Sequence, residues 1–139
     1  MASAEDIRSY LNEHDQFCRH NGITLTHIEP GYAEAEMIVT DAMLNSRGVV
    51  QGGAIFTLAD FTFAGAANAA GAGCVSLNCS ISFIKPGTPP KLRAVARELH
   101  RGRCTGVYQV EVFDAKNKLV AAATVNGFAV GTFPPADGE

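Results

Sequence analysis

The chain has 139 residues, of which 47% are hydrophobic and 18% charged, so it can fill the core of one domain but not of two. Its net charge of −3 gives no basic field for nucleic-acid binding, no run of about 20 apolar residues could span a bilayer, and the N-terminus lacks the features of a signal peptide. We therefore expect one cytoplasmic domain over residues 1–139, with no nucleic-acid or membrane partner.

The cysteines and histidines are spaced too irregularly to indicate a metal site. Neither a C-x-x-C pair nor a paired histidine motif occurs, and a secreted disulfide scaffold would need a higher density of cysteine. We expect reduced, structural thiols, no metal and no cofactor. The cysteines are Cys18, Cys74, Cys79 and Cys104.

Residues 4–20 carry apolar side chains at helical spacing and end at Asn21-Gly22, so an N-terminal helix is predicted within residues 1–20. Residues 23–39 alternate between polar and apolar side chains about a turn, which predicts a hairpin. Residues 41–53 have no clean periodicity and are expected to form a loop.

Residues 53–70 are apolar around nearly the whole helical circumference, which predicts a buried helix. Four further alternating runs are predicted as strands, at residues 75–83, 92–99, 107–113 and 119–130. Strands gathered around one segregated helix favour an α+β class, with an antiparallel sheet around that helix. The core is expected over about residues 20–131 and a flexible tail over residues 132–139.

Asp60 lies in the middle of this apolar helix. An ionised carboxylate away from water is costly unless it is paired, and no lysine or arginine occurs from Val49 to Ile84 to pair with it locally. Two interpretations stay open: a catalytic carboxylate, or a structural one that faces a solvent seam or bonds to a polar neighbour. Those neighbours are Thr57, Thr62 and Asn68.

Gly52-Gly53 opens the same helix. The first N–H groups of a helix have no intrahelical partner and carry the positive end of its dipole, and glycine lets a ligand approach them closely. Such a terminus can hold a carbonyl oxygen as it becomes an oxyanion. A plain tight turn is the alternative interpretation.

Gly52 and Asp60 are eight positions apart, which is about 12 Å along a helix. A nucleophile and an oxyanion donor must both reach one carbonyl group, at about 3 Å each. One chain therefore cannot supply both. If both residues are catalytic, two copies of the helix pack antiparallel about a two-fold axis, and the site lies at the interface of an obligate homodimer.

The segment from Asn45 to Asp60, NSRGVVQGGAIFTLAD, resembles the signature of hotdog-fold thioesterases of the phenylacetyl-CoA thioesterase type, approximately N-x-x-G-x-x-H-G-G-x-x-F-x-L-A-D. Residues 80–86 and 101–103 also resemble that branch, and the similarity runs over about residues 20–130. The resemblance implies a hotdog fold, in which a curved antiparallel sheet wraps a central helix, and an acyl-CoA substrate. We further expect the dimers to pair into a homotetramer.

By this resemblance the Gly52 N–H would stabilise the oxyanion, Asp60 of the other subunit would act as nucleophile or general base, and Asn45 would orient the thioester or a water. One position departs from the signature, because Gln51 stands where the family has histidine. Glutamine keeps hydrogen-bonding capacity but carries no proton near neutral pH. We expect activity to survive, because the oxyanion donor and the carboxylate remain.

The substrate implies further contacts. The adenosine diphosphate of CoA needs cationic partners, and the candidates are Lys85, Arg101 and Arg103. The alternative for each is an ordinary solvated side chain, which is the usual state of a surface lysine or arginine. The pantetheine arm is expected along the strand that carries Asn78 and Ser80, near Gly53, unless this is a plain core strand. An acyl pocket between subunits is expected to be lined by Leu44, Phe56, Phe61 and Phe63.

These inferences predict hydrolysis of an aryl-acyl or short-to-medium-chain acyl-CoA. A non-catalytic acyl-CoA binder or sensor is the alternative, favoured by Gln51, and release of free thiol separates the two. A hotdog hydratase or dehydratase is disfavoured, because no suitable histidine lies beside Asp60 in the sequence.

Overall fold

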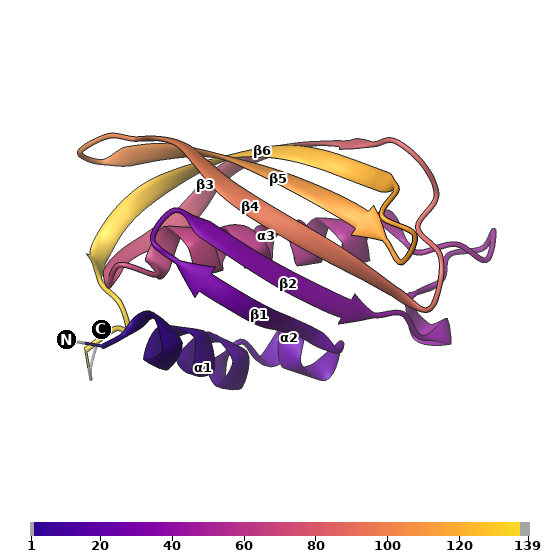
Figure 1. The fold of residues 1–139 in the computed structure, drawn as a ribbon, viewed down its shortest axis with the longest axis horizontal. Helices are drawn as coiled ribbons and strands as arrows, with labels where there is room; N and C mark the ends of the chain where they lie inside the picture. The colour runs from indigo at the N-terminus through magenta and orange to yellow at the C-terminus, as the bar shows by residue number, and fades with distance from the viewer. Residues whose placement is uncertain (1, 137–139) are drawn as a thin grey trace.

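The computed structural model describes residues 2–136 and shows one curved sheet around a long helix (Figure 1). Two short helices come first, α1 (Ala4–His14) and α2 (Gln16–His20), and the long helix is α3 (Gly52–Asn68), preceded by a 3-10 turn, η1 (Asp41–Met43). The strands are β1 (Ile23–Glu29), β2 (Tyr32–Ile38), β3 (Ala72–Phe83), β4 (Lys91–Arg101), β5 (Thr105–Asp114) and β6 (Leu119–Thr132).

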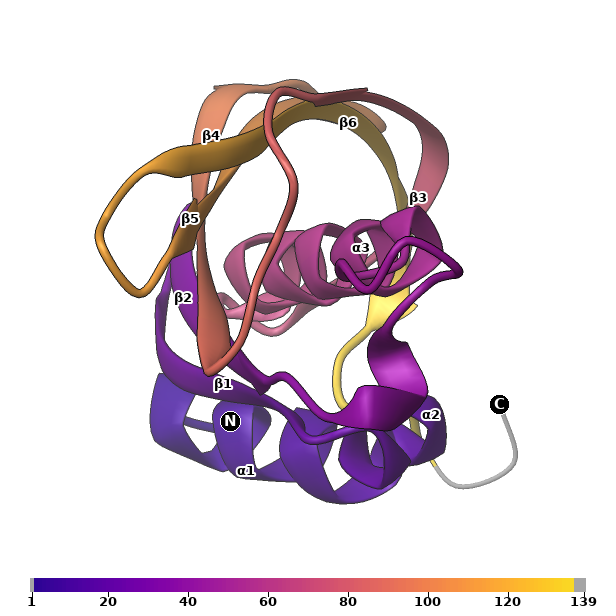
Figure 2. The ribbon, with the colours of Figure 1, turned by 90° about the vertical axis from the view of Figure 1, so that its right-hand side faces the viewer.

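All six strands form one antiparallel sheet in the order β1-β2-β4-β5-β6-β3. The sheet curves over α3, so that the helix lies inside the curve (Figure 2). Gly65 lets α3 approach the first hairpin closely, because a Cβ there would lie only 2.8 Å from Leu25 Cδ2 and 2.9 Å from Ile28 Cγ2. The predicted α+β class and hotdog arrangement are confirmed.

The N-terminal segment expected to form one helix forms two, with the break at Asp15. Its N–H bonds to the Leu11 carbonyl at 3.0 Å and so closes α1. Its carboxylate accepts a hydrogen bond from the Cys18 N–H at 3.0 Å and caps α2. Aspartate is a preferred N-cap residue, so a new helix begins where the apolar spacing alone predicts continuation.

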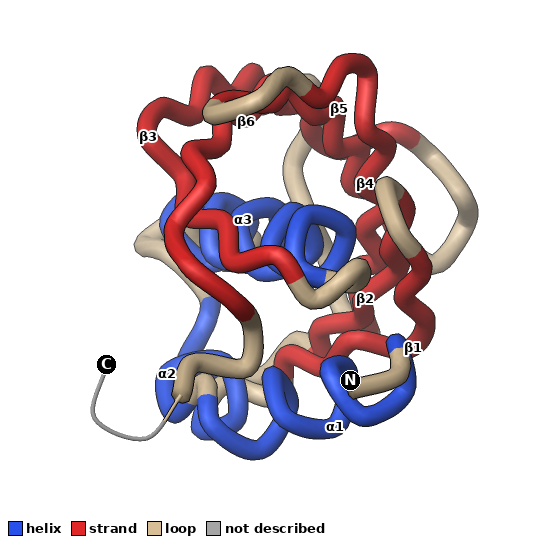
Figure 3. Tube along the Cα trace, turned by 90° about the vertical axis from the view of Figure 1, so that its left-hand side faces the viewer, coloured by secondary structure: helices blue, strands red, loops and turns tan. Residues whose placement is uncertain are grey.

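The two edges of the sheet differ, as Figure 3 shows, with α1 beside β1 and β3 at the opposite margin. The Asn12 side chain of α1 donates to the Leu25 carbonyl at 3.0 Å and accepts from the Leu25 N–H at 2.8 Å. α1 thus provides hydrogen-bond partners for backbone groups at the β1 edge, as a further strand would. Within residues 2–136, β3 pairs only with β6, and it exposes apolar side chains such as Val75 and Leu77.

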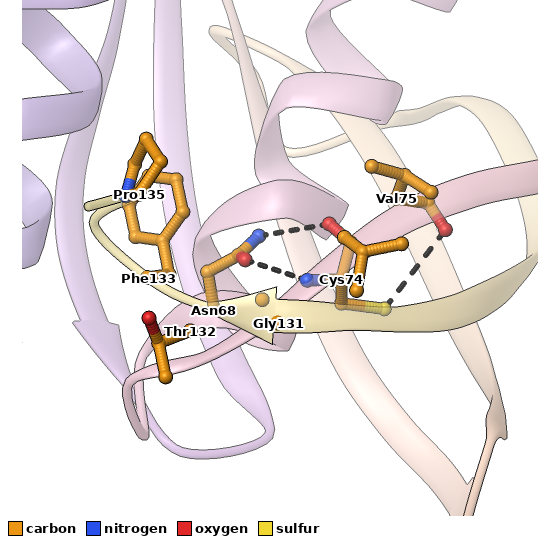
Figure 4. A pocket seen from close by; sticks show the side chains of 9 residues that line it. Asn68, Cys74, Val75, Gly131, Thr132, Phe133 and Pro135 are labelled. Atoms are coloured by element: carbon orange, nitrogen blue, oxygen red, sulfur yellow. Dashed lines mark hydrogen bonds between the residues drawn. The ribbon is translucent and has the colours of Figure 1, made fainter. Parts of the chain in front are cut away.

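Asn68 ties the C-terminal end of α3 to the start of β3. Its amide nitrogen donates to the Cys74 carbonyl at 3.2 Å, and its oxygen accepts from the Cys74 N–H at 2.9 Å (Figure 4). Both residues line a pocket of about 460 Å³ that also includes residues 130–133. No predicted site residue lines this pocket, which lies at the end of α3 opposite to Gly52.

The expected flexible tail includes Phe133, whose ring packs edge-on against Tyr10 with 5.5 Å between centroids. Residues 137–139 of that tail lie outside the described part of the chain.

None of the described helices has the length and apolarity needed to cross a membrane. The cytoplasmic location stays a prediction.

Asp114 is a buried carboxylate at the end of β5 that holds the turn to β6. One oxygen accepts from the N–H groups of Lys116 and Lys118, each at 2.9 Å, and the other bonds the Lys85 ammonium at 2.5 Å. These contacts, the Lys85 hydrogen bond foremost, lower the pKa of Asp114 to about 2.

We expect Asp114 to make the free energy of unfolding fall in acid. A carboxylate with a lower pKa in the folded state contributes stability above its unfolded pKa and loses it as the pH falls through the folded value, here from about 4 to about 2. Urea unfolding of Asp114→Asn should therefore show a deficit at neutral pH that shrinks across this window. A deficit that stays constant would contradict this, and Asp41→Asn, at an exposed carboxylate, is the control.

Candidate active site

Asp60 lies half-exposed at the middle of α3, on the wall of a hollow of about 320 Å³. Phe56 and Phe61 of α3 and Phe17 of α2 provide aromatic surface there. Asp15 adds a second carboxylate from the junction of α1 and α2. The other lining residues are Cys18, Thr57 and Ala64.

Burial raises the pKa of Asp60 above the ordinary carboxyl value; a hydrogen bond from the Ser76 hydroxyl opposes this effect, and the charge of Asp15 adds to it. The neighbours considered as hydrogen-bond partners for Asp60 are Thr57, Thr62 and Asn68. Their side chains donate to backbone carbonyl groups and not to the Asp60 carboxylate. No lysine or arginine in the described chain forms an ion pair with Asp60. The carboxylate is left without a cationic partner.

The N-terminus of α3 presents one unpaired N–H group. Gln51 is the N-cap, and its side-chain oxygen accepts a hydrogen bond from the Gly53 N–H. The N–H groups of Ala54 and Ile55 bond to the Gln51 carbonyl at 2.9 and 3.3 Å. The Gly52 N–H has no acceptor among residues 2–136, so it is the donor that remains for an incoming oxygen.

Gly52 lines a second hollow, of about 420 Å³, together with Asn45 and Lys85. Asn45 shapes the loop before α3, because its Oδ1 accepts from the N–H groups of Arg47 at 2.9 Å and Val49 at 3.3 Å. Its Nδ2 group has no acceptor in the described chain and is the part of the side chain that is free for a ligand.

The predicted catalytic residues therefore lie in separate hollows. Asn45 and Gly52 line one hollow, Asp60 lines the other, and no residue lines both. Gly52 and Asp60 belong to one continuous helix, which keeps them about 12 Å apart. Gln51 and Gly53 line a third hollow, of about 350 Å³, which shares residues 17 and 57 with the Asp60 hollow. Within a single chain, these residues are not brought together in one hollow.

Of the four residues expected around the acyl group, two line the Asp60 hollow and two pack in or against the core. Phe56 and Phe61 line the Asp60 hollow. Phe63 does not, because two further residues turn the side chain to the opposite face of a helix; it is 1% exposed and packs against Tyr108 with 5.0 Å between ring centroids. Leu44 is half-buried and packs against the core.

The residues expected to contact CoA are scattered over the subunit. Asn78 and Ser80 are exposed on the edge strand β3. Lys85 lies near Gly52 but is paired with Asp114. Arg101 lies at the other end of α3, where its guanidinium donates to the Ala67 carbonyl at 3.0 Å. Arg103 is exposed in the β4–β5 turn. One chain does not gather these cations at one place.

Sequence reasoning missed the polar residues that surround Asp60 from other elements. Asp15 and Cys18 reach its hollow from the α1–α2 junction and α2. Burial raises the pKa of the Cys79 thiol of β3, with the charge of Asp60 as a further cause, which places Cys79 near the carboxylate as well. The Asp15 N-cap was the only one of these with a local sequence signal.

These features place the chain in a known class of protein. The family model described as the thioesterase superfamily matches residues 47–121, which include the start of α3, Asp60 and β3 to β5. The chain belongs to the thioesterase superfamily, and its curved sheet around α3 is the hotdog fold.

Comparisons with individual proteins show which members of the superfamily the chain is similar to. The acyl-coenzyme A thioesterase PaaI of Escherichia coli is 38% identical over 112 residues, 80% of each chain. The structure of the E. coli PaaI protein from the phenylacetic acid degradation operon superposes with a TM-score of 0.89 at 34% identity, over 93% of this chain and 94% of that one. A Streptococcus mutans protein solved bound to acetyl CoA has a TM-score of 0.75 at 32% identity, over 79% and 90% of the two chains.

Gln51 is expected to stabilise the fold through its cap. Replacing it by Ala leaves the Gly53 N–H without a partner and should lower the free energy of unfolding by about 1 kcal/mol, within a range of about 0.5 to 2. Gln51→Ser offers another capping oxygen and should retain most of the stability. Urea unfolding of the three proteins tests this, and an unchanged Gln51→Ala midpoint contradicts the capping role.

Proposed function

We propose that this protein hydrolyses acyl-CoA thioesters, with the Asp60 carboxylate of one subunit acting on a carbonyl group held by the Gly52 N–H of another. The proposal is carried by two groups of α3, which in the described chain are a carboxylate without a cationic partner and an N–H group without an acceptor. Asp60 has no cationic partner and Gly52 has no acceptor within the described residues. A reacting thioester offers a partner to each of them at once.

The chemistry follows from these two groups. The Gly52 N–H, at the positive end of α3, polarises the thioester carbonyl and stabilises the oxyanion that forms. Asp60 either attacks the carbonyl carbon and displaces the CoA thiolate, forming an anhydride that water then hydrolyses to the free acid, or takes a proton from a water that attacks the carbonyl carbon and displaces the thiolate. The free Nδ2 of Asn45, in the hollow of Gly52, orients the thioester or that water. Gln51 caps the N-terminus of α3 and so holds the Gly52 N–H in place. A histidine is not needed for this capping role.

The exposed face of α3 supports a two-fold contact between copies. Positions 52, 56 and 60 follow each other at intervals of four and so share one face of the helix, which the subunit's own sheet leaves at least partly exposed. When Gly52 of one antiparallel helix lies opposite Asp60 of the other, the axis passes near Phe56. That side chain is 38% exposed in the single chain, and the contact would bury it.

The free edge of the sheet supports the same contact. β3 exposes backbone groups and apolar side chains, including Val75 at 47% and Leu77 at 64% exposure, whereas α1 occupies the β1 edge. An open apolar edge is a template for pairing with another strand. We infer that β3 contributes to the dimer interface, and the association of two dimers into a tetramer stays a prediction.

The two-fold also accounts for the scattered cations. Under the same antiparallel pairing, the C-terminal end of α3, where Arg101 is anchored, comes to the side of the partner's Asn45 loop. Lys85 of one subunit and Arg101 and Arg103 of the other then approach one CoA molecule, which needs cationic partners for its phosphates. The acyl group extends into the Asp60 hollow, whose aromatic lining suits an aryl-acyl or short-to-medium alkyl group.

Replacing Asp60 by Asn should abolish turnover while keeping the fold. The variant should release thiol from phenylacetyl-CoA or hexanoyl-CoA at least about 100-fold more slowly, because an amide neither attacks nor takes a proton. In the wild type, kcat/KM should fall as acid protonates Asp60, at a pH above the ordinary carboxyl range. Wild-type activity in Asp60→Asn refutes the assignment, and tight binding without thiol release by the wild type identifies a binder instead.

Gly52→Pro provides a matched test of the oxyanion donor. Proline removes the N–H and suits the first helical position, and the extended backbone of Gln51 (φ −61°, ψ 135°) suits a residue before proline. Turnover should fall by about 100-fold or more. Gly52→Ala, whose Cβ would lie 3.2 Å from Phe83 Cζ but which keeps the N–H, is the control and should lose less.

Mixing the two inactive variants tests whether the site is shared. In a mixed dimer of Gly52→Pro and Asp60→Asn subunits, one site combines the intact Asp60 with the intact Gly52, so exchange at equal amounts should restore about a quarter of wild-type activity. Residues that act within one chain would give no recovery.

A further inference from the structure

Asp15 is a charged residue on the wall of the Asp60 hollow to which the mechanism above gives no role. Its carboxylate is fixed in place, because it caps α2 through the Cys18 N–H at 3.0 Å and also hydrogen bonds with the Cys18 thiol. Its position is therefore set by the break between α1 and α2. A fixed charge on a ligand cavity acts on whatever enters that cavity.

The hollow carries negative charge without a counter-charge. Of its eight lining residues two are acidic and none is basic. The other titratable groups near Asp60 are thiols, Cys18 of α2 and Cys79 of β3, and burial raises the pKa of both, so they are neutral near pH 7. Ser76 of β3 adds only a hydroxyl.

In the proposed reaction the thioester carbonyl lies beside Asp60, and the hollow open to the remainder of the acyl group there is the one that Asp15 also lines. We propose that Asp15 selects the acyl group by charge: the hollow accepts uncharged aryl or alkyl acyl groups and rejects acyl groups that end in a carboxylate. This inference rests on the thioesterase function proposed above. At an effective dielectric constant of about 20, two carboxylates about 6 Å apart disfavour each other by roughly 100-fold in affinity.

Hexanoyl-CoA and adipoyl-CoA test the proposal, because they have the same number of acyl carbons and differ by a terminal carboxylate. The wild type should prefer hexanoyl-CoA strongly in kcat/KM, measured as release of free thiol. Asp15→Asn removes the charge and keeps a capping oxygen, since Asn and Asp are similar N-caps. The ratio of kcat/KM for adipoyl-CoA to that for hexanoyl-CoA should rise about tenfold or more in this variant.

Glu13→Gln is the matched control. It removes the same charge from an exposed position of α1 that does not line the hollow, and its ratio should stay at the wild-type value. The acid limb of the pH profile gives a second readout, because loss of the Asp15 charge should move this limb to lower pH in Asp15→Asn and not in Glu13→Gln. Asp15→Ala removes the charge and the cap together, so its ratio should rise as in Asp15→Asn while its rates on both substrates fall further with the loss of the cap.

The outcomes separate the two proposals. A wild type that hydrolyses hexanoyl-CoA but shows the same ratio in Asp15→Asn overturns the role of Asp15 and leaves the thioesterase function standing. Equal wild-type rates on the two substrates also overturn it. A wild type that releases no thiol from hexanoyl-CoA or phenylacetyl-CoA overturns the proposed function, and the selection by Asp15 with it.

Discussion

The half-buried carboxylate of Asp60 is the group around which the rest of the molecule has to be understood. An apolar side chain at this position would suit α3 better, because burial disfavours the ionised acid and no cation in residues 2–136 pairs with it. A carboxylate with a pKa perturbed in this way is a candidate for a chemical role. The same helix also starts with an N–H group that lacks an acceptor, at Gly52. Each of the two groups can bind an atom of a ligand. One rigid helix holds them too far apart to contact the same carbonyl group within a single chain.

This separation gives the proposed dimer a chemical purpose. A two-fold axis near Phe56 is the simplest operation that brings an intact pair of groups together, and it creates two equivalent sites. Within residues 2–136, only one edge of the sheet is available for such a contact. Asn12 of α1 hydrogen bonds with the backbone of the β1 edge, whereas the β3 edge is open and exposes apolar side chains. Helix face, strand edge and catalytic groups thus favour the same association.

Local sequence patterns predicted the features that depend on neighbours in the chain. The buried helix over residues 53–70, the strands and the arrangement of sheet around helix follow from periodicity, and α3 is found at Gly52–Asn68. The break at Asp15 was missed because one capping side chain outweighs the apolar spacing that continues through it. Phe63 was assigned to the acyl pocket, but the helical rotation from Phe61 turns it into the core.

Contacts between distant segments could not be predicted. Lys85 pairs with Asp114, and Arg101 donates a hydrogen bond to the last turn of α3. In both cases the fold brings together residues that are far apart in the sequence. The position of Asp15 beside Asp60 is of the same kind, since it depends on how α2 packs on α3. Asp15, far from Asp60 in the sequence, therefore lines the same hollow, and no sequence motif predicts this.

The mass of the species that performs hydrolysis tests the central claim most directly. Sedimentation of the active enzyme through a layer of thioester substrate, followed by thiol release, reports the size of the molecules that turn over. A site shared across the two-fold predicts that activity sediments as a dimer or a multiple of it, and that specific activity falls on dilution as monomers form. Monomers that hydrolyse the thioester at the full rate would contradict the account.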